Sequence, residues 1–84
     1  ELDYGSSNIV DEFGDTWDQV GEITHTLYPD GVSLSEPNEY AKFHITQWMI
    51  GKIVRYANSG SIDSIHDAGV YAFILESIVT KEQG

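Results

Sequence analysis

The feature that most constrains the fold is a helical spacing of apolar residues that recurs three times along the chain. Apolar residues three or four positions apart indicate an amphipathic α-helix, because one turn takes 3.6 residues. Tyr28-Pro-Asp-Gly31 ends the first pattern, and Asn58-Ser-Gly-Ser61 ends the second, both with typical turn residues. The spacing therefore predicts helices over 8–27, 36–57 and 62–80.

The second predicted helix is expected to lie in the middle of the fold. Ser35-Glu36-Pro37 reads as an N-cap at Ser35, an acid and an early proline. Apolar residues then fill much of the circumference of the helix, which suggests contact with more than one neighbour. The turn at 58–61 is so short that the flanking helices must fold back on each other. We expect one all-α domain over 1–84, an antiparallel three-helix arrangement.

The chain is small for an independent core. It has 84 residues, 40 % of them hydrophobic, and a domain of this size buries only about 60–65 % of its unfolded surface. We expect a homo-oligomer, most simply a dimer formed through the aromatic residues. The absence of cysteine excludes disulfides and thiolate metal sites. No apolar run approaches the roughly 20 residues of a membrane span. We expect no membrane contact and a cytoplasmic protein, in the host cytoplasm if phage-encoded.

The charge balance is strongly acidic. Fourteen Asp and Glu face four Lys and Arg, a formal net charge of −10. Such a field repels nucleic acid phosphates, so direct binding of DNA or RNA is not expected. It suits divalent cations or a basic protein surface, and it also keeps a protein in solution without any partner.

Two cations and two acids are expected to face one cleft. Lys52 and Arg55 lie one turn apart near the end of the second predicted helix, and Asp63 and Asp67 lie four residues apart in the third. The cations suit phosphate oxygens, and a carboxylate pair suits Mg²⁺ or Mn²⁺. A structural reading uses the same residues: Asp63 favours a helix N-terminus, and Asp67 pairs with Lys52 or Arg55 across the turn.

Acidic residues also crowd the first predicted helix. Like charges four residues apart are mildly destabilising, so a metal ion or a basic partner would relieve the cluster. A solvated acidic face is the simpler reading. We name Glu12 and Asp15 as further candidate metal ligands. The candidate residues for binding a partner are Asp11, Asp15, Asp18 and Glu22. The sequence shows no nucleophile motif, no glycine-rich phosphate loop and no zinc pattern, and His25 and His44 lack metal-ligand spacing.

Several short motifs run through the chain in a recognisable order. They are Asp3-Tyr-Gly-Ser-Ser, Phe13-Gly, Lys52-x-x-Arg55 and Asp63-x-x-x-Asp67-x-x-x-Tyr71-Ala. In this order the chain resembles the phage and bacterial "nucleotide modification associated domain 1" family, which is related to MazG-like nucleoside triphosphate pyrophosphohydrolases. The resemblance covers nearly the whole chain and is strongest over residues 48–76.

The resemblance implies a fold, a reaction and roles for four residues. The superfamily is all-α and usually oligomeric, and its active members cleave nucleoside triphosphates to monophosphate and pyrophosphate with Mg²⁺ held by Glu and Asp. Carried to this chain, the resemblance would make Asp63 and Asp67 acids on the metal side. Lys52 and Arg55 would be cations on the phosphate side or structural cations.

The chain departs from the family pattern at two places. The family usually has a Glu about four residues before the first Asp, and that place is Ser59 here. The paired E-x-x-E of typical MazG proteins is absent, and Asp11, Glu12 and Asp15 would replace it only loosely. The resemblance therefore implies either a hydrolase or a relative that keeps the fold without the reaction.

Two functional hypotheses follow. The first is a MazG-like protein that binds nucleotides, with Mg²⁺-dependent pyrophosphohydrolysis as its reaction if catalysis is retained. The second is a non-catalytic acidic protein, such as a phage-encoded inhibitor, that covers a basic, nucleic-acid-binding surface of a host or defence protein. The motifs favour the first hypothesis, and the missing Glu and the charge favour the second.

Overall fold

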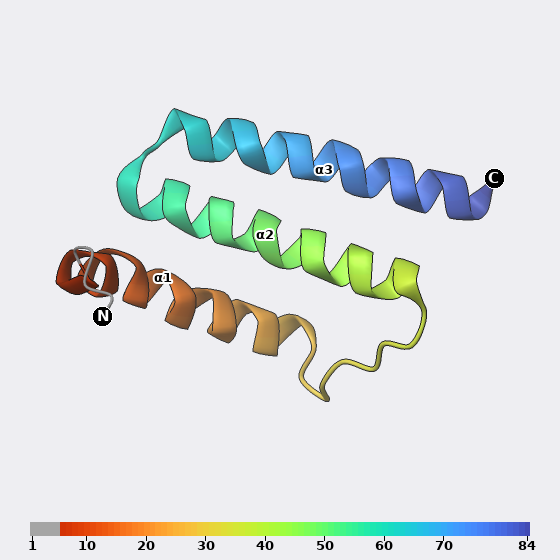
Figure 1. Cartoon of the computed structure of the whole chain (residues 1–84), viewed down its shortest axis with the longest axis horizontal. Helices are drawn as coiled ribbons and strands as arrows, with labels where there is room; N and C mark the ends of the chain where they lie inside the picture. Colours follow the sequence, from red (N-terminus) through yellow and green to blue (C-terminus); the bar gives the residue numbers. More distant parts are fainter. Residues whose placement is uncertain (1–5) are drawn as a thin grey trace.

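A computed structural model describes the backbone of residues 6–84 and the side chains of residues 16–84. Three α-helices make up the described chain: α1 (Ser6–Leu27), α2 (Pro37–Ser59) and α3 (Ile62–Gln83), with no strand among these residues (Figure 1). The all-helical prediction is confirmed, and the predicted helix ends lie within three residues of the observed ones. Residues 3–5 of the opening motif Asp3-Tyr-Gly-Ser-Ser lie outside the described residues.

A proline and a glutamate define the start of α2. Pro37 is the first helical residue, and it restricts the preceding residue to an extended backbone. Glu36 is therefore extended, with ψ 150°, and is the N-cap; the prediction of Ser35 as N-cap was wrong by one residue. The Glu39 carboxylate accepts hydrogen bonds from the backbone N–H groups of Glu36 (3.0 Å) and Ser35 (2.8 Å).

A tight turn joins α2 to α3. Gly60 has φ 72°, a left-handed conformation that glycine adopts without strain, and its N–H donates to the Tyr56 carbonyl at 2.7 Å. Ser61 caps α3 by accepting a hydrogen bond from the Ser64 N–H at 3.3 Å. The turn predicted from Asn58-Ser-Gly-Ser61 is confirmed, and it returns the chain alongside α2 (Figure 1).

Helix α2 is the central helix, as its broad apolar circumference predicts. It packs against α1 on one side and α3 on the other, whereas α1 and α3 do not touch within the described residues (Figure 1). Towards α1, Ile50 and Val54 meet Val20 in a small buried core. The Phe43 ring also meets Tyr28 edge-on, with 5.6 Å between the ring centres.

The contacts between α2 and α3 include an aromatic pair and charged groups. The Trp48 and Tyr71 rings meet edge-on at 5.6 Å. Nearer the C-terminus of α3, the Glu82 carboxylate accepts hydrogen bonds from Lys42, at 2.8 Å, and from the Asn38 amide. These two donors lower the pKa of Glu82, the Lys42 bond contributing most. The far end of α3 is thereby tied to the first turns of α2.

The buried core is small. Among the described residues only Val20, Ile50 and Val54 are buried apolar side chains, and no side chain is completely enclosed. Many large apolar side chains remain exposed on all three helices. None of the described helices combines the length and the apolar character needed to cross a membrane.

Candidate functional site

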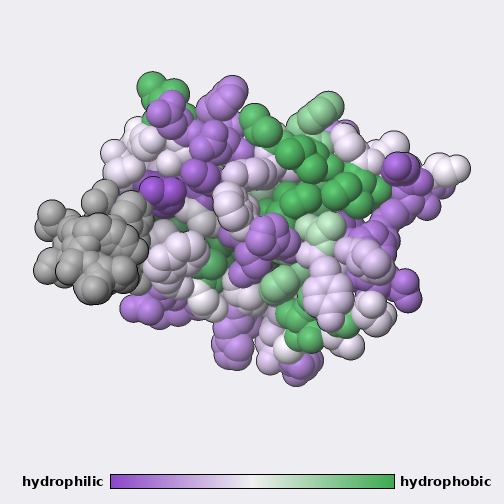
Figure 2. All heavy atoms as spheres, viewed as in Figure 1, coloured by the Kyte–Doolittle hydropathy of each residue, from purple (hydrophilic) through white to green (hydrophobic). Residues whose placement is uncertain are grey.

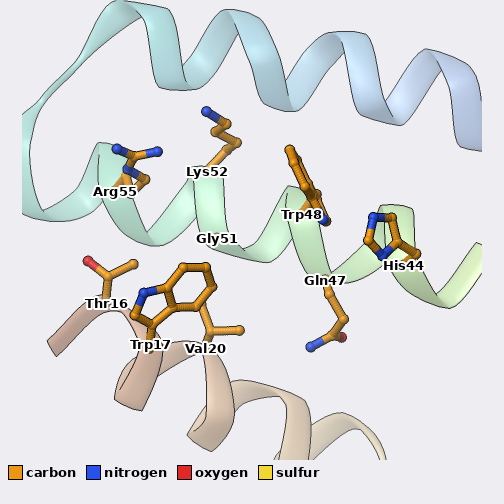
Figure 3. A pocket seen from close by; sticks show the side chains of 9 residues that line it. All are labelled: Thr16, Trp17, Val20, His44, Gln47, Trp48, Gly51, Lys52 and Arg55. Atoms are coloured by element: carbon orange, nitrogen blue, oxygen red, sulfur yellow. The ribbon is translucent and has the colours of Figure 1, made fainter. Parts of the chain in front are cut away.

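A pocket of about 540 Å³ opens beside α2, on the side where α1 approaches it (Figure 3). Both helices contribute side chains, and the lining combines two indole rings, two cations, polar groups and one glycine. It consists of Thr16, Trp17, Val20, His44, Gln47, Trp48, Gly51, Lys52 and Arg55.

Two tryptophans supply most of the aromatic surface. Trp17 is 68 % exposed and reaches from α1 towards α2, where its indole lies beneath Gly51 (Figure 3). Trp48 stacks obliquely on His44, with 5.4 Å between the ring centres. Apart from its chain neighbours and the nearby backbone of its own helix, no atom lies within 4 Å of the position that a Cβ would take on Gly51, so α2 can be approached closely there. Broad, partly exposed aromatic faces of this kind can hold a planar ring.

Two of the four cations of the chain, Lys52 and Arg55, line this pocket. The Lys52 ammonium lies 3.1 Å from the Asp67 carboxylate of α3, and the Lys52 side chain is only 19 % exposed. In Figure 3 the Lys52 side chain is directed towards α3, in agreement with this ion pair. The predicted contact of Asp67 across the turn is confirmed, with Lys52 as its partner.

The two α3 acids are placed differently from each other. Asp67 is half-buried against Lys52, whereas Asp63 lies exposed in the first turn of α3, where a negative charge suits the helix dipole. Neither acid lines the pocket. Ser59, which stands where the family has Glu, is exposed, and its hydroxyl donates to the Arg55 carbonyl at 2.8 Å.

A metal site with three protein ligands is not formed by the described side chains alone. No group of three His, Cys, Asp or Glu with suitable geometry occurs among them. The side chains of Asp11, Glu12 and Asp15 lie outside the described residues, so their role as metal ligands or partner contacts stays a prediction. Asp18 and Glu22, the other candidates for binding a partner, are exposed on α1.

A buried amide oxygen marks the edge of the pocket nearest α1. The Gln47 side-chain N–H donates to the Thr24 hydroxyl at 2.7 Å, and that hydroxyl donates to the Val20 carbonyl at 2.7 Å. This chain of bonds orients the Gln47 amide. Its Oε1 is buried and has no hydrogen-bond donor among the described residues. A buried acceptor without a donor is costly, so a donor brought to this place would gain binding energy.

The sequence reasoning missed the tryptophans, His44 and Gln47 as site residues. Trp17 and Trp48 fall on the helical spacing of the apolar residues, and that spacing does not separate a residue of a binding site from one of the core. The missed signal is the spacing of Trp48, Lys52 and Arg55, which are four and then three residues apart. Positions separated in this way lie on one face of a helix, so an indole and two cations share a surface.

Comparisons of this chain with protein-family models, with curated proteins and with solved structures find no match. The resemblance to the nucleotide modification associated family thus stays a prediction based on its motifs. Of the pocket residues, only Lys52 and Arg55 belong to the motifs that carry the resemblance.

Proposed function

We propose that the chain is a MazG-like nucleotide-binding protein and that the pocket between α1 and α2 receives a nucleoside phosphate. One observation carries this proposal: half of the cations of a chain with net charge −10 line the same pocket as both of its tryptophans. Its volume, about 540 Å³, falls within the usual range of small-molecule sites. Cations beside indoles match a ligand that has an anionic and an aromatic part.

The base would lie against the indoles. Stacking of a nucleobase on an aromatic side chain contributes about 1–3 kcal/mol and tolerates every base. Trp17 has the more exposed side chain, so its ring would turn more easily to face a base. The Trp48 ring is held in place by contacts with Tyr71 and His44. An exocyclic amino group on the base would provide the donor that the Gln47 amide oxygen lacks.

The phosphates would lie at Arg55 and Lys52. Arginine binds phosphate oxygens through two parallel N–H bonds, and lysine acts as a point charge. Lys52 would then share its ammonium between the phosphate and Asp67, which lies 3.1 Å away.

Mg²⁺ is the cofactor that this arrangement would take. Mg²⁺ commonly binds one or two carboxylates together with waters and substrate phosphates. Only a few carboxylates lie near Lys52, and this number fits an ion that arrives bound to the nucleotide. Asp67 and Asp63 would be its protein ligands, with Glu12 or Asp15 as further candidates. When bound, the ion would neutralise phosphate charge and activate a water for pyrophosphohydrolysis.

The arrangement of the helices and the oligomeric state are part of the same proposal. We infer an antiparallel, MazG-like three-helix protomer that forms a homo-oligomer. The single central helix with a neighbour on each side supports this arrangement, as do the many exposed apolar side chains.

Calorimetric titration with a panel of nucleoside and deoxynucleoside triphosphates, with and without Mg²⁺, tests the proposal. Arg55→Gln should weaken binding about tenfold or more, because hydrogen bonds to charged groups contribute about 1.5–3 kcal/mol. Lys81→Gln removes the same charge at the exposed end of α3 and should leave affinity nearly unchanged. The absence of binding by the unchanged chain, or equal effects of the two variants, would rule out this pocket. Pyrophosphate release in the same samples reports whether the chain is a hydrolase.

The second candidate function is that of an acidic protein that covers a basic surface. Asp18 and Glu22 favour it, because both are exposed on α1, four residues apart. Such binding should weaken as salt rises, since screening reduces attraction between opposite charges. The triple change of Asp11, Asp15 and Asp18 to Asn should abolish competition between this chain and DNA for a basic protein. Unchanged competition would exclude the acidic face of α1.

A further inference from the structure

The pocket contains an unfilled gap between Trp17 and Gly51. The Trp17 indole extends from α1 to a place beneath Gly51 of α2 (Figure 3). Outside the neighbouring backbone of α2, however, no atom lies within 4 Å of the position that a Cβ would take on Gly51. The indole is therefore not in contact with that position. One wall of the gap is an aromatic ring, and the opposite wall is the backbone of α2.

Packing within the chain does not account for the exposure of Trp17. A tryptophan side chain usually buries a large part of its surface, but 68 % of Trp17 is exposed. Its neighbours Thr16 and Val20 are buried, and Val20 packs against Ile50 and Val54 of α2. The backbone of α1 is thus held against α2 beside Trp17, while the indole itself keeps a free surface.

Packing does not account for Gly51 either. Glycine inside a helix is less favourable than alanine, and its usual benefit is that another group can approach the backbone closely. No contact among the described residues uses this benefit at Gly51, because the place of its Cβ is open. Gly69 of α3 is equally open but does not line the pocket. An open glycine alone is therefore no sign of a site, whereas Gly51 lies opposite an exposed indole.

Polar side chains lie on both sides of the gap along α2. Gln47 and Arg55 are four residues before and after Gly51, so the three positions share one face of the helix, and all line the pocket. Four residues span about 6 Å along a helix axis. A flat group at Gly51 would thus have an amide on one side and a guanidinium on the other, each about one turn away.

The character of this surface differs from that of α3. Figure 2 shows apolar residues gathered over the part of the molecule where Figure 1 places the middle and the C-terminal half of α3. In the pocket, by contrast, Val20 is the only aliphatic residue of the lining. The gap therefore suits a ligand with a flat aromatic part and polar groups, and not an aliphatic one.

We propose that the gap between Trp17 and Gly51 is the base slot of the nucleotide pocket. Gly51 is its positioning residue, because the absence of a side chain lets a base lie flat against the backbone of α2. This inference rests on the proposed nucleotide function and deepens it by assigning the base to Trp17. Trp48 is the poorer choice, since its ring already contacts His44 and Tyr71. A slot made of a ring and a backbone accepts the flat face of any base.

Gly51→Ala tests the slot, because the added methyl group would occupy the space of the base. Calorimetric titration should show that a nucleoside triphosphate binds this variant about fivefold more weakly or worse, the effect of losing base stacking. Inorganic tripolyphosphate, which has no base, should bind Gly51→Ala and the unchanged chain equally. Gly69→Ala is the matched control: it adds the same group at an open helical glycine outside the pocket and should change neither affinity.

The two variants are expected to fold. Alanine is a better helix former than glycine, and neither new methyl group meets another part of the chain. The midpoint of thermal unfolding should therefore rise in both Gly51→Ala and Gly69→Ala. A loss of nucleotide binding confined to Gly51→Ala is then not a loss of structure.

The fluorescence of Trp17 gives a second readout of the slot. The chain has two tryptophans, so Trp48→Phe leaves Trp17 as the only one. A base stacked on this indole should quench its emission. Adding Gly51→Ala to the same chain should shift the quenching to nucleotide concentrations about fivefold higher or more. Trp17 emission that stays constant at saturating nucleotide would overturn the inference.

The outcomes separate the slot from the proposed function. If no nucleoside triphosphate binds the unchanged chain, the proposed function fails and the slot fails with it. If a nucleotide binds the unchanged chain, Gly51→Ala and Gly69→Ala with equal affinity, nucleotide binding stands and the slot is wrong. An equal loss of nucleotide and tripolyphosphate affinity in Gly51→Ala would place the effect at the phosphates and would also overturn the slot.

Discussion

At the residue scale, the ion pair of Lys52 and Asp67 belongs both to the packing of the helices and to the proposed binding site. The pair links α2 to α3, and its Lys52 side chain also lines the pocket. Because the Asp67 side chain is 41 % exposed, solvent screens the pair, and its contribution to stability is modest. In the proposed nucleotide site, the same carboxylate would compete with a phosphate for Lys52 and would also serve a bound Mg²⁺.

Asp67→Asn should therefore change nucleotide affinity in opposite directions with and without Mg²⁺. Without the ion, loss of the competing carboxylate frees Lys52, and binding should tighten. With the ion, loss of a ligand should weaken it. The free energy of unfolding should fall by about 1 kcal/mol or less. Calorimetry in Mg²⁺ and in EDTA measures both affinities.

Glu76→Gln is the control for that experiment, since it removes the same charge from an exposed site on α3. It should leave both affinities nearly equal to those of the unchanged chain. A tightening of binding by Asp67→Asn under both conditions would exclude Asp67 as a metal ligand while leaving Lys52 as the phosphate contact.

At the element scale, the start of α2 depends on one carboxylate. The pKa of Glu39 is lowered, chiefly by the hydrogen bond from the backbone N–H of Glu36 and next by those from Ser35. A carboxyl whose pKa is lowered in the folded chain stabilises the fold above its unfolded pKa, about 4.3. That stabilisation is lost as the pH falls through the lower, folded pKa. Glu82, whose pKa is also lowered, adds a loss of the same sign.

Thermal unfolding followed by circular dichroism between neutral and acid pH should reveal this dependence. Glu39→Gln should be less stable than the unchanged chain at neutral pH, and the difference should shrink as the pH falls below about 4. Glu22→Gln on α1 is the control, because it removes one negative charge without removing the hydrogen bonds at the start of α2. A difference that stays constant with pH would show that the Glu39 carboxylate does not stabilise α2 through these bonds.

At the scale of the whole molecule, the three helices leave much of their apolar surface open. Among residues 16–84, whose side chains are described, three buried apolar side chains form a small core. If self-association supplies the remaining burial, stability depends on the concentration of the chain, because association stabilises only the folded state. Repulsion between acidic copies opposes it at low salt.

The midpoint of thermal unfolding should therefore rise with protein concentration and also with NaCl. A midpoint that is the same over a hundredfold range of concentration in the unchanged chain would indicate a stable monomer. The exposed apolar side chains would then need another explanation.

Local signals predicted the elements well. The spacing of apolar residues and the turn at Asn58-Ser-Gly-Ser61 are properties of neighbouring residues, so the helices were predicted to within three residues at each end. The N-cap of α2 was misplaced because Ser35 is a common capping residue, whereas the steric effect of Pro37 on Glu36 decided the position. A contact of Asp67 with Lys52 or Arg55 was predictable because a short turn limits where the two helices can meet, and the structure selects Lys52.

The sequence by itself determined three helices and their order, and it limited the partner of Asp67 across the second turn to Lys52 or Arg55, since each follows from residues close in the chain. Only the tertiary structure decided which apolar residues are buried. Periodicity alone cannot separate a core indole from the exposed indole of Trp17, because both fall on the same spacing. The exposed apolar residues of α3 follow from its packing against α2 alone within the described residues, and the pocket depends on the separation of α1 and α2. That separation is a property of packing between distant segments.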